Sequence, residues 1–353
     1  MRDLRKGMES GVARQGSMTE EGPNARNADR RDFLRRLAGA GAIVAGSGVA
    51  AVLLRDRETG SDGGRAGEAD AAPRLARYAV ELPPGAPRMS IARGSDAPAM
   101  VRAAMEGMGG VGRFIQKGDV VVVKPNVGFD RSPRLGATTS PEVVGAVVAL
   151  CREAGAARVI VVDNPINNPE GSFLRSGVGP SVEENGGEVL LPAARHFREI
   201  EIGGEALERW EFFYEPFRRA TKVIGLPTAK SHNLSVASLA MKNWYGLLGR
   251  GRNRFHQAID TAIADLGSLV TPTLVVLDAT RLLVRNGPTG GSPADVKPGH
   301  TIAVSADQVA LDAFGLELLG KAPADAPWLR QAEERGLGTG DWRSLSPRDV
   351  QVG

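Results

Sequence analysis

Cationic and imidazole side chains in one short stretch are the strongest candidates for chemistry in this chain. Lys230 and His232 follow an apolar run at 222–227, and Lys242 and Asn243 lie a little further along the chain. A half-buried lysine needs an anion or a carbonyl group opposite it, because an unpaired buried charge is costly. A neutral imidazole can move a proton or bind a metal. The stretch therefore predicts a site for a small anionic or carbonyl ligand.

Polar side chains also follow the other apolar runs that predict strands. They are Lys124 with Asn126, Asp163 with Asn164, Asp278, and Asp307. The carboxyl ends of parallel strands share one edge of a sheet, where α/β proteins bind ligands. We therefore expect one catalytic site, in which Lys124, Lys230 and Lys242 neutralise or polarise the substrate and His232 is the acid/base group.

The remaining candidates divide into substrate-binding and metal-binding residues. The predicted substrate-binding residues are Asn126, Asn164, Asn243, Asn286 and Gly287, the last two in a Gly-rich loop whose backbone N–H groups suit an anion. The predicted metal ligands are Asp163, His256 and Asp278, since carboxylates bind hard cations. Carboxylates at these positions also orient an imidazole or cap the next helix, and both alternatives stay open. The only cofactor that these residues indicate is a divalent metal.

Several classes of function are excluded by what the sequence lacks. A single cysteine, Cys151, allows no intrachain disulfide and no iron–sulfur cluster within the chain, and its place in a helical pattern predicts a buried apolar residue. The P-loop, the G-x-S-x-G elbow and the H-E-x-x-H zinc motif are missing, and no G-x-G-x-x-G follows the first predicted strand. The positive charge is concentrated in residues 1–57 and the rest is nearly neutral, so nucleic-acid binding is not expected.

The first part of the chain has the layout of a twin-arginine export signal. Residues 1–29 are polar and predicted to be disordered. Arg30-Arg31-Asp32-Phe33-Leu34 then precedes a weakly hydrophobic run at 37–54. This order predicts the twin-arginine translocase as a partner and a periplasmic or other extracytoplasmic location. No cleavage site closes the run cleanly, so the segment at 30–54 is either removed or kept as a marginal membrane anchor through 37–54.

The elements expected to position the site form one α/β domain. Residues 55–77 are predicted to be a linker. Short apolar runs alternate with helical patterns over 78–353, which predicts a mainly parallel, doubly wound, Rossmann-like sheet with helices on both faces. Apolar spacing predicts single helices over 171–185 and 234–248. An aromatic-rich segment at 195–219 predicts a lid or a hairpin insertion.

The combination of short motifs resembles the family called domain of unknown function 362. The matching stretches are 118–126, 139–144, 162–164, 230–232, 241–243, 246–249, 277–279 and 286–288. The likeness covers roughly residues 85–320. It implies an α/β fold and export by the twin-arginine route. Some members carry ferredoxin-like iron–sulfur segments, which a chain with one cysteine departs from, and the family name implies no reaction.

Two functional hypotheses follow from the predicted rim. The first is an exported enzyme that acts on a small anionic or carbonyl substrate. The second is a non-catalytic extracytoplasmic protein that binds a metal, an anion or a cofactor. A purely structural envelope protein is disfavoured, because it has no use for a rim of lysines, carboxylates and imidazoles.

Overall fold

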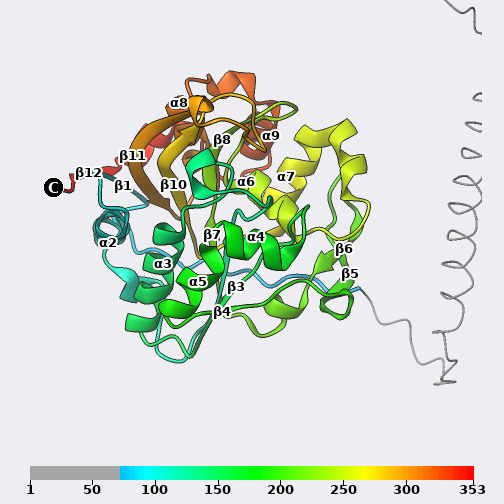
Figure 1. The fold of residues 1–353 in the computed structure, drawn as a ribbon, viewed down its shortest axis with the longest axis horizontal. Helices are drawn as coiled ribbons and strands as arrows, with labels where there is room; N and C mark the ends of the chain where they lie inside the picture. The colour runs from blue at the N-terminus through cyan, green and yellow to red at the C-terminus, as the bar shows by residue number, and fades with distance from the viewer. Residues whose placement is uncertain (1–71) are drawn as a thin grey trace, which may run out of the picture. The chain divides into compact units, whose positions relative to one another are not determined.

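A ten-stranded mixed sheet forms the centre of the computed structural model, which describes residues 72–353 (Figure 1). Its main path runs through β12 (Arg348–Gln351), β1 (Met89–Arg93), β11 (Val296–Ser305), β10 (Leu274–Leu283), β7 (Lys222–Leu226), β2 (Val120–Pro125), β3 (Arg158–Val161) and β4 (Glu188–Val189). Two further strands branch from it, since β8 (Thr228–His232) pairs with β10 and β9 (Val236–Ser238) pairs with β8.

The sheet is mainly parallel, as the sequence predicts. The pairs from β10 through β7, β2 and β3 to β4 are all parallel, whereas β11 is antiparallel to both β1 and β10. From β2 the chain adds β3 and β4 on one side and then crosses to add β7 and β10 on the other. The order of strands therefore reverses between β2 and β7. In a doubly wound sheet this switch point is where a crevice opens for ligands.

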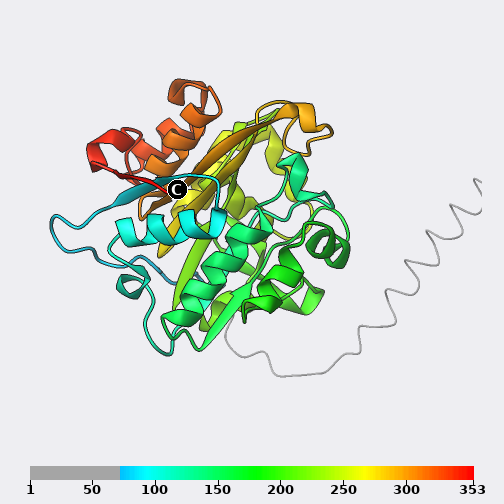
Figure 2. The same ribbon diagram turned by 60° about the vertical axis from the view of Figure 1, so that its left-hand side comes forward.

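Helices cover both faces of the sheet (Figure 2). One group consists of α2 (Ala97–Gly107), α3 (Pro141–Glu153), α4 (Pro169–Arg175) and α5 (Val178–Glu184), in which α3 packs against α2 and α5, and α4 packs against α5. The other consists of α6 (Ala240–Asn243), α7 (Ile259–Leu269), α8 (Gln308–Leu318) and α9 (Pro327–Glu334). This arrangement confirms the predicted fold class.

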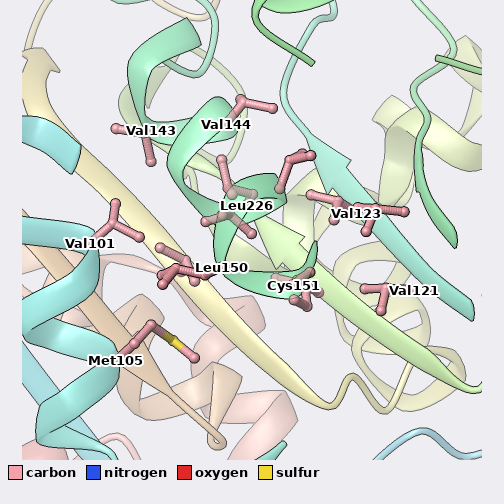
Figure 3. Close-up of a cluster of buried hydrophobic side chains, with 14 of the residues drawn as sticks. Val101, Met105, Val121, Val123, Val143, Val144, Leu150, Cys151 and Leu226 are labelled. Carbon is pink, nitrogen blue, oxygen red and sulfur yellow. The ribbon is translucent and has the colours of Figure 1, made fainter. Parts of the chain in front are cut away.

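The core beneath α2 and α3 explains why these segments form amphipathic helices. Val101 and Met105 of α2 and Leu150 of α3 face Val123 of β2 across the apolar cluster shown in Figure 3. Cys151 lies in the same cluster, where burial raises the pKa of its thiol to about 12. It acts as a small apolar side chain. Burial of this continuous apolar stripe is the main driving force for helix formation here.

The predicted helices over 171–185 and 234–248 are both wrong in detail. Gly177 adopts a left-handed conformation with φ +73° and separates α4 from α5. In the second segment the chain forms β9, a single turn of α6 and a 3₁₀ turn, η5 (Trp244–Leu247). Val236 there has a positive φ of 65°, which interrupts any continuous helix.

The aromatic-rich segment forms a hairpin of two antiparallel strands, β5 (Phe197–Glu201) and β6 (Arg209–Phe213). No helix within residues 72–353 is both long and apolar enough to cross a membrane. The predicted disordered extension, the twin-arginine segment at 30–54 and most of the linker at 55–77 lie outside the described residues.

Candidate functional site

A cavity of about 300 Å³ lies at the switch point between β2 and β7. We call it the switch-point cavity. The polar and charged residues that line it include Lys124, Asn126, Asp163, Asn164, Lys230, His232, Lys242, Asn243, Arg252 and His256. They come from β2 and the residue after it, from β8, from α6, from the loop that follows β3 and from the 3₁₀ helix η6 (Arg252–Ala258). Segments far apart in the sequence are thus brought to one site at the predicted edge of the sheet.

A buried ion pair forms part of the cavity wall. Lys124 Nζ lies 2.8 Å from Asp163 Oδ1, and both side chains are almost completely buried. The carboxylate also accepts the backbone N–H groups of Val127 at 2.6 Å and Asn164 at 2.8 Å. Burial lowers the pKa of Lys124, and the Asp163 charge opposes that shift. The negative charge of Asp163 is therefore already compensated by protein groups.

Glycine is required beside this ion pair. A Cβ at Gly246 would overlap the Asp163 carboxylate and crowd Lys124 Nζ, so a larger residue would force the pair apart. The Gly246 carbonyl accepts the N–H of Asn164 at 3.0 Å, which fixes the loop after β3 against η5. This close approach gives a physical reason for the glycine in the stretch at 246–249.

Two asparagines connect the ion pair to a second lysine. Asn243 Oδ1 accepts from Lys124 Nζ at 3.2 Å and from Asn126 Nδ2 at 3.1 Å, while its amide group donates to the Lys124 carbonyl. Lys230 Nζ donates to Asn126 Oδ1 at 2.8 Å and to the Ala137 carbonyl at 2.6 Å. Burial lowers the pKa of Lys230 to about 7, and the nearby Lys242 charge contributes. These bonds hold Lys230 in a fixed position.

Lys242 differs from the other two lysines in its contacts. Its Nζ lies 3.9 Å from the centre of the Tyr245 ring, a cation–π contact. Among residues 72–353 it has no hydrogen-bonded acceptor or carboxylate partner, and its side chain is nearly buried. Burial lowers its pKa to about 7, and repulsion from Arg252 and Lys124 adds to the shift. An amine in this setting is partly uncharged near neutral pH and is accessible from the cavity.

The imidazole of His232 is held by the backbone and not by a carboxylate. Its Nδ1 accepts the N–H groups of Leu234 at 3.1 Å and Ser235 at 3.3 Å, which leaves the proton of the neutral ring on Nε2. Burial, followed by repulsion from Lys242 and Lys230, lowers the pKa of His232 to about 3. The predicted alternative that Asp163 or Asp278 orients this ring is wrong, and the ring serves as a neutral N–H donor at neutral pH.

Arg252 is a cavity residue that was not predicted from the sequence. Its guanidinium donates to the carbonyls of Asn164 at 2.9 Å and Leu248 at 3.3 Å. His256, one turn further on, stacks against Tyr245 with ring centres 5.5 Å apart and lies 6.5 Å from the His232 ring. The sequence signal was the basic segment at 250–254 immediately before His256. A charged loop alone does not indicate which of its arginines turns inward.

Three predicted site residues do not line the cavity. Asp278 accepts the Ser140 N–H at 2.7 Å and the Thr280 hydroxyl, so it fixes the start of α3. Asn286 donates to Asp295 at 2.9 Å, and the Gly287 N–H donates to Ser231 Oγ. The next two residues of that loop, 288–289, do line the cavity. Asp307 accepts the N–H groups of residues 309 and 310 and so caps α8.

The geometry gives the metal prediction no support. Within the described part of the chain, no three His, Cys, Asp or Glu side chains are placed to hold a metal ion. Asp163 is engaged with Lys124, and Asp278 belongs to a separate network, whereas His256 faces the cavity. A divalent metal at these residues stays a prediction from the sequence.

Comparison with known proteins places the chain in a family. It is 30% identical over 261 residues to a thylakoid-associated protein of Synechocystis sp., covering 68% of this chain and 75% of that one. It is similar to a crystal structure of a Thermotoga maritima protein with a TM-score of 0.36 and 10% identity, over 69% of this chain and 60% of the other. Residues 121–317 match the family described as domain of unknown function (DUF362), and the chain therefore belongs to this family.

Proposed function

We propose that this protein is an enzyme that binds a small organic anion in the switch-point cavity, with Lys242 as its reactive group. The observation that carries the proposal is the balance of charge. Lys124, Lys230, Lys242 and Arg252 line one cavity with a single carboxylate, Asp163, which is already paired with Lys124. A buried excess of cations is stabilised by a bound anion.

The chemistry assigned to Lys242 follows from the differences among the lysines. Lys124 is paired with a carboxylate and Lys230 donates to two oxygen acceptors. The Lys242 amine has only an aromatic face beside it, and its pKa, lowered by burial to about 7, makes an uncharged amine available at neutral pH. An uncharged amine can take a proton from carbon next to a carbonyl group, and this proton acceptor is the role we assign.

A neutral hydrogen-bond donor in the same cavity can stabilise the carbonyl oxygen of the ligand, which becomes negative when the proton leaves the neighbouring carbon. His232 offers its Nε2–H, and the pKa of about 3 keeps that ring neutral throughout. Arg252, together with Lys230 when it is protonated, supplies positive charge in a site of low solvent exposure, where electrostatic stabilisation is strong. The reaction class that this arrangement favours is enolisation of a small carboxylate that also carries a carbonyl group.

The test combines binding with isotope exchange. We expect calorimetry to detect binding of pyruvate, with an affinity that falls as salt rises, and proton NMR in D₂O to show protein-dependent exchange of its methyl protons. Lys242→Met should abolish exchange and weaken binding by about tenfold, which corresponds to ~1.4 kcal/mol. Binding without exchange in any 2-oxo acid tested would instead favour the non-catalytic binding protein. Absence of any carboxylate binding would contradict the proposal.

We also infer export by the twin-arginine route, on the strength of Arg30-Arg31-Asp32-Phe33-Leu34 and the weakly apolar run after it. The test uses the full chain in a twin-arginine-competent host. Replacing Arg30 and Arg31 with lysine should stop translocation, whereas the matched replacement of Arg35 and Arg36 should have little effect. Fractionation and the mass of the exported chain would show whether the segment at 37–54 is cleaved or kept as an anchor.

A further inference from the structure

Two exposed apolar side chains lie at the mouth of the switch-point cavity, Ile166 and Leu234, and we call this pair the apolar collar. Ile166 and Leu234 line the cavity, yet their side chains are 66% and 52% exposed. Within residues 72–353 they are two of the three large hydrophobic side chains that are exposed, the third being Leu174 of α4, which lies outside the cavity. A single exposed leucine is ordinary. The clustering of two of these three side chains at one opening, by contrast, calls for an explanation.

The fold does not require these two side chains to be apolar. The Ile166 N–H donates to the Gly128 carbonyl at 2.9 Å, and the Leu234 N–H donates to His232 Nδ1 at 3.1 Å. Both residues therefore hold their loops through backbone groups that any residue except proline supplies. Their exposed side chains gain little from burial in the protein as it stands, so their apolar character points to something that covers them.

Polarity changes from one end of the cavity to the other. The lysine side chains are deeply buried, with Lys124 at 0%, Lys230 at 1% and Lys242 at 7% exposure. The half-buried Phe129 also lines the cavity, and its ring centre is 5.1 Å from Lys230 Nζ. A ligand that reaches from floor to mouth thus meets cations first and then the apolar collar, which stands beside the exposed Asn233 and Asn253.

We propose that the ligand is an amphiphilic carboxylate, whose anionic head lies among the lysines and whose apolar tail lies against Ile166 and Leu234. This inference rests on the proposed function, because it takes the cationic floor as the anion site. The cavity volume of about 300 Å³ is at the small end for ligand pockets, so it suits a compact head group with a tail that extends into the mouth. The continuity of collar and cationic floor favours one ligand that spans both over a protein partner that covers the collar alone.

The experiment measures dissociation constants for straight-chain carboxylates from acetate to octanoate at fixed ionic strength. Full burial of one methylene strengthens binding roughly fourfold, and one-sided contact at an open mouth should give roughly twofold per methylene. Ile166→Ser combined with Leu234→Ser should flatten this dependence and leave acetate binding within about twofold of its original value. Leu174→Ser, an equally exposed leucine away from the cavity, is the matched control and should keep the full dependence.

The possible outcomes separate the two proposals. Acetate binding with no gain along the series would overturn the amphiphilic ligand and leave the anion site standing. A dependence on chain length that survives the double substitution would overturn the assignment of the tail to Ile166 and Leu234. Failure of every carboxylate, acetate included, to bind would overturn the anion site and the inference with it. Circular dichroism of the double variant checks that it is folded.

Discussion

At the scale of single residues, the protonation state of Lys242 is the property on which the proposed chemistry depends. We expect the Lys242 amine to have a pKa of about 7, because the side chain is buried and faces Arg252 and Lys124. Carbon-13 NMR of lysine Cε groups measures this directly, and Lys242→Met identifies the signal by removing it. A Lys242 midpoint close to the ordinary lysine value would contradict the assigned role as proton acceptor.

Lys242 should also lower the stability of the folded protein in a pH-dependent way. Its folded pKa of about 7 lies below the unfolded value of 10.5, so the unfolded chain binds more protons between these limits and stability rises with pH across that window. Below about pH 7 the full burial cost is present. Lys242→Met should therefore increase the free energy of unfolding near pH 6 by on the order of 2 kcal/mol, with a smaller gain near pH 10. Urea unfolding at both pH values checks this.

A loss of stability in Lys242→Met at low pH would show that the ammonium has a favourable partner in the folded protein. Comparison of the variant with the unsubstituted chain at each pH cancels the titration of buried groups that do not interact with Lys242, whereas Lys230 and His232, whose pKa values its charge lowers, contribute to the difference. Asp312 is one of the groups that cancel, since burial raises its pKa to about 8 and its titration affects both proteins equally. The difference between the two curves is therefore the quantity to measure.

At the scale of elements, the short helix α6 depends on a residue far away in the sequence. Asp312 of α8 accepts the N–H groups of Ala240 at 2.5 Å and Met241 at 3.0 Å, the first two residues of α6. A helix of one turn has little stability of its own, so this contact positions Lys242 and Asn243. Asp312→Ala leaves two buried N–H groups unpaired and should cost about 2–4 kcal/mol of stability.

Ligand affinity distinguishes a positioning role for Asp312 from a purely structural one. We expect Asp312→Ala to weaken anion binding under conditions where the variant is still folded, whereas Asp312→Asn, which keeps one acceptor oxygen, should retain more of both stability and affinity. Unfolding curves and calorimetry on the same samples provide the two readouts. Unchanged affinity in a destabilised but folded Asp312→Ala variant would mean that α6 is held by other contacts.

Burial and tertiary contacts together explain which elements were predictable from sequence. The runs at 120–125, 158–161 and 222–226 are apolar because those strands are buried on both faces, so local composition identifies them. The helix predicted over 234–248 failed because the positive φ of Val236 and the contact from Asp312 come from tertiary structure. Strand ends likewise placed Lys124, Asp163 and Lys230 together. The inward turn of Arg252 and the engagement of buried Asp278 with Ser140 depend on tertiary contacts that composition does not determine.

At the scale of the whole molecule, the cavity joins segments from both sides of the sheet's switch point. The loop after β3 contributes Asp163 and Ile166, and β8 with the turn after it contributes Lys230 and Leu234. The polar chain from Asp163 through Lys124, Asn243 and Asn126 to Lys230 links these sides directly. A ligand held by this cavity should therefore stabilise the two sides together.

Hydrogen exchange with and without a saturating carboxylate tests this coupling. A ligand at one hundred times its dissociation constant adds about 2.7 kcal/mol to stability if it binds only the folded state. We expect the slowing of amide exchange to extend over 126–131, 163–168, 232–239 and 250–257, which surround the cavity, with β12 and α9 showing only the global effect. Protection confined to one of these loops would mean that the anion binds at that loop alone. The cationic groups of the switch point would then act separately, and the cavity would not be a single site.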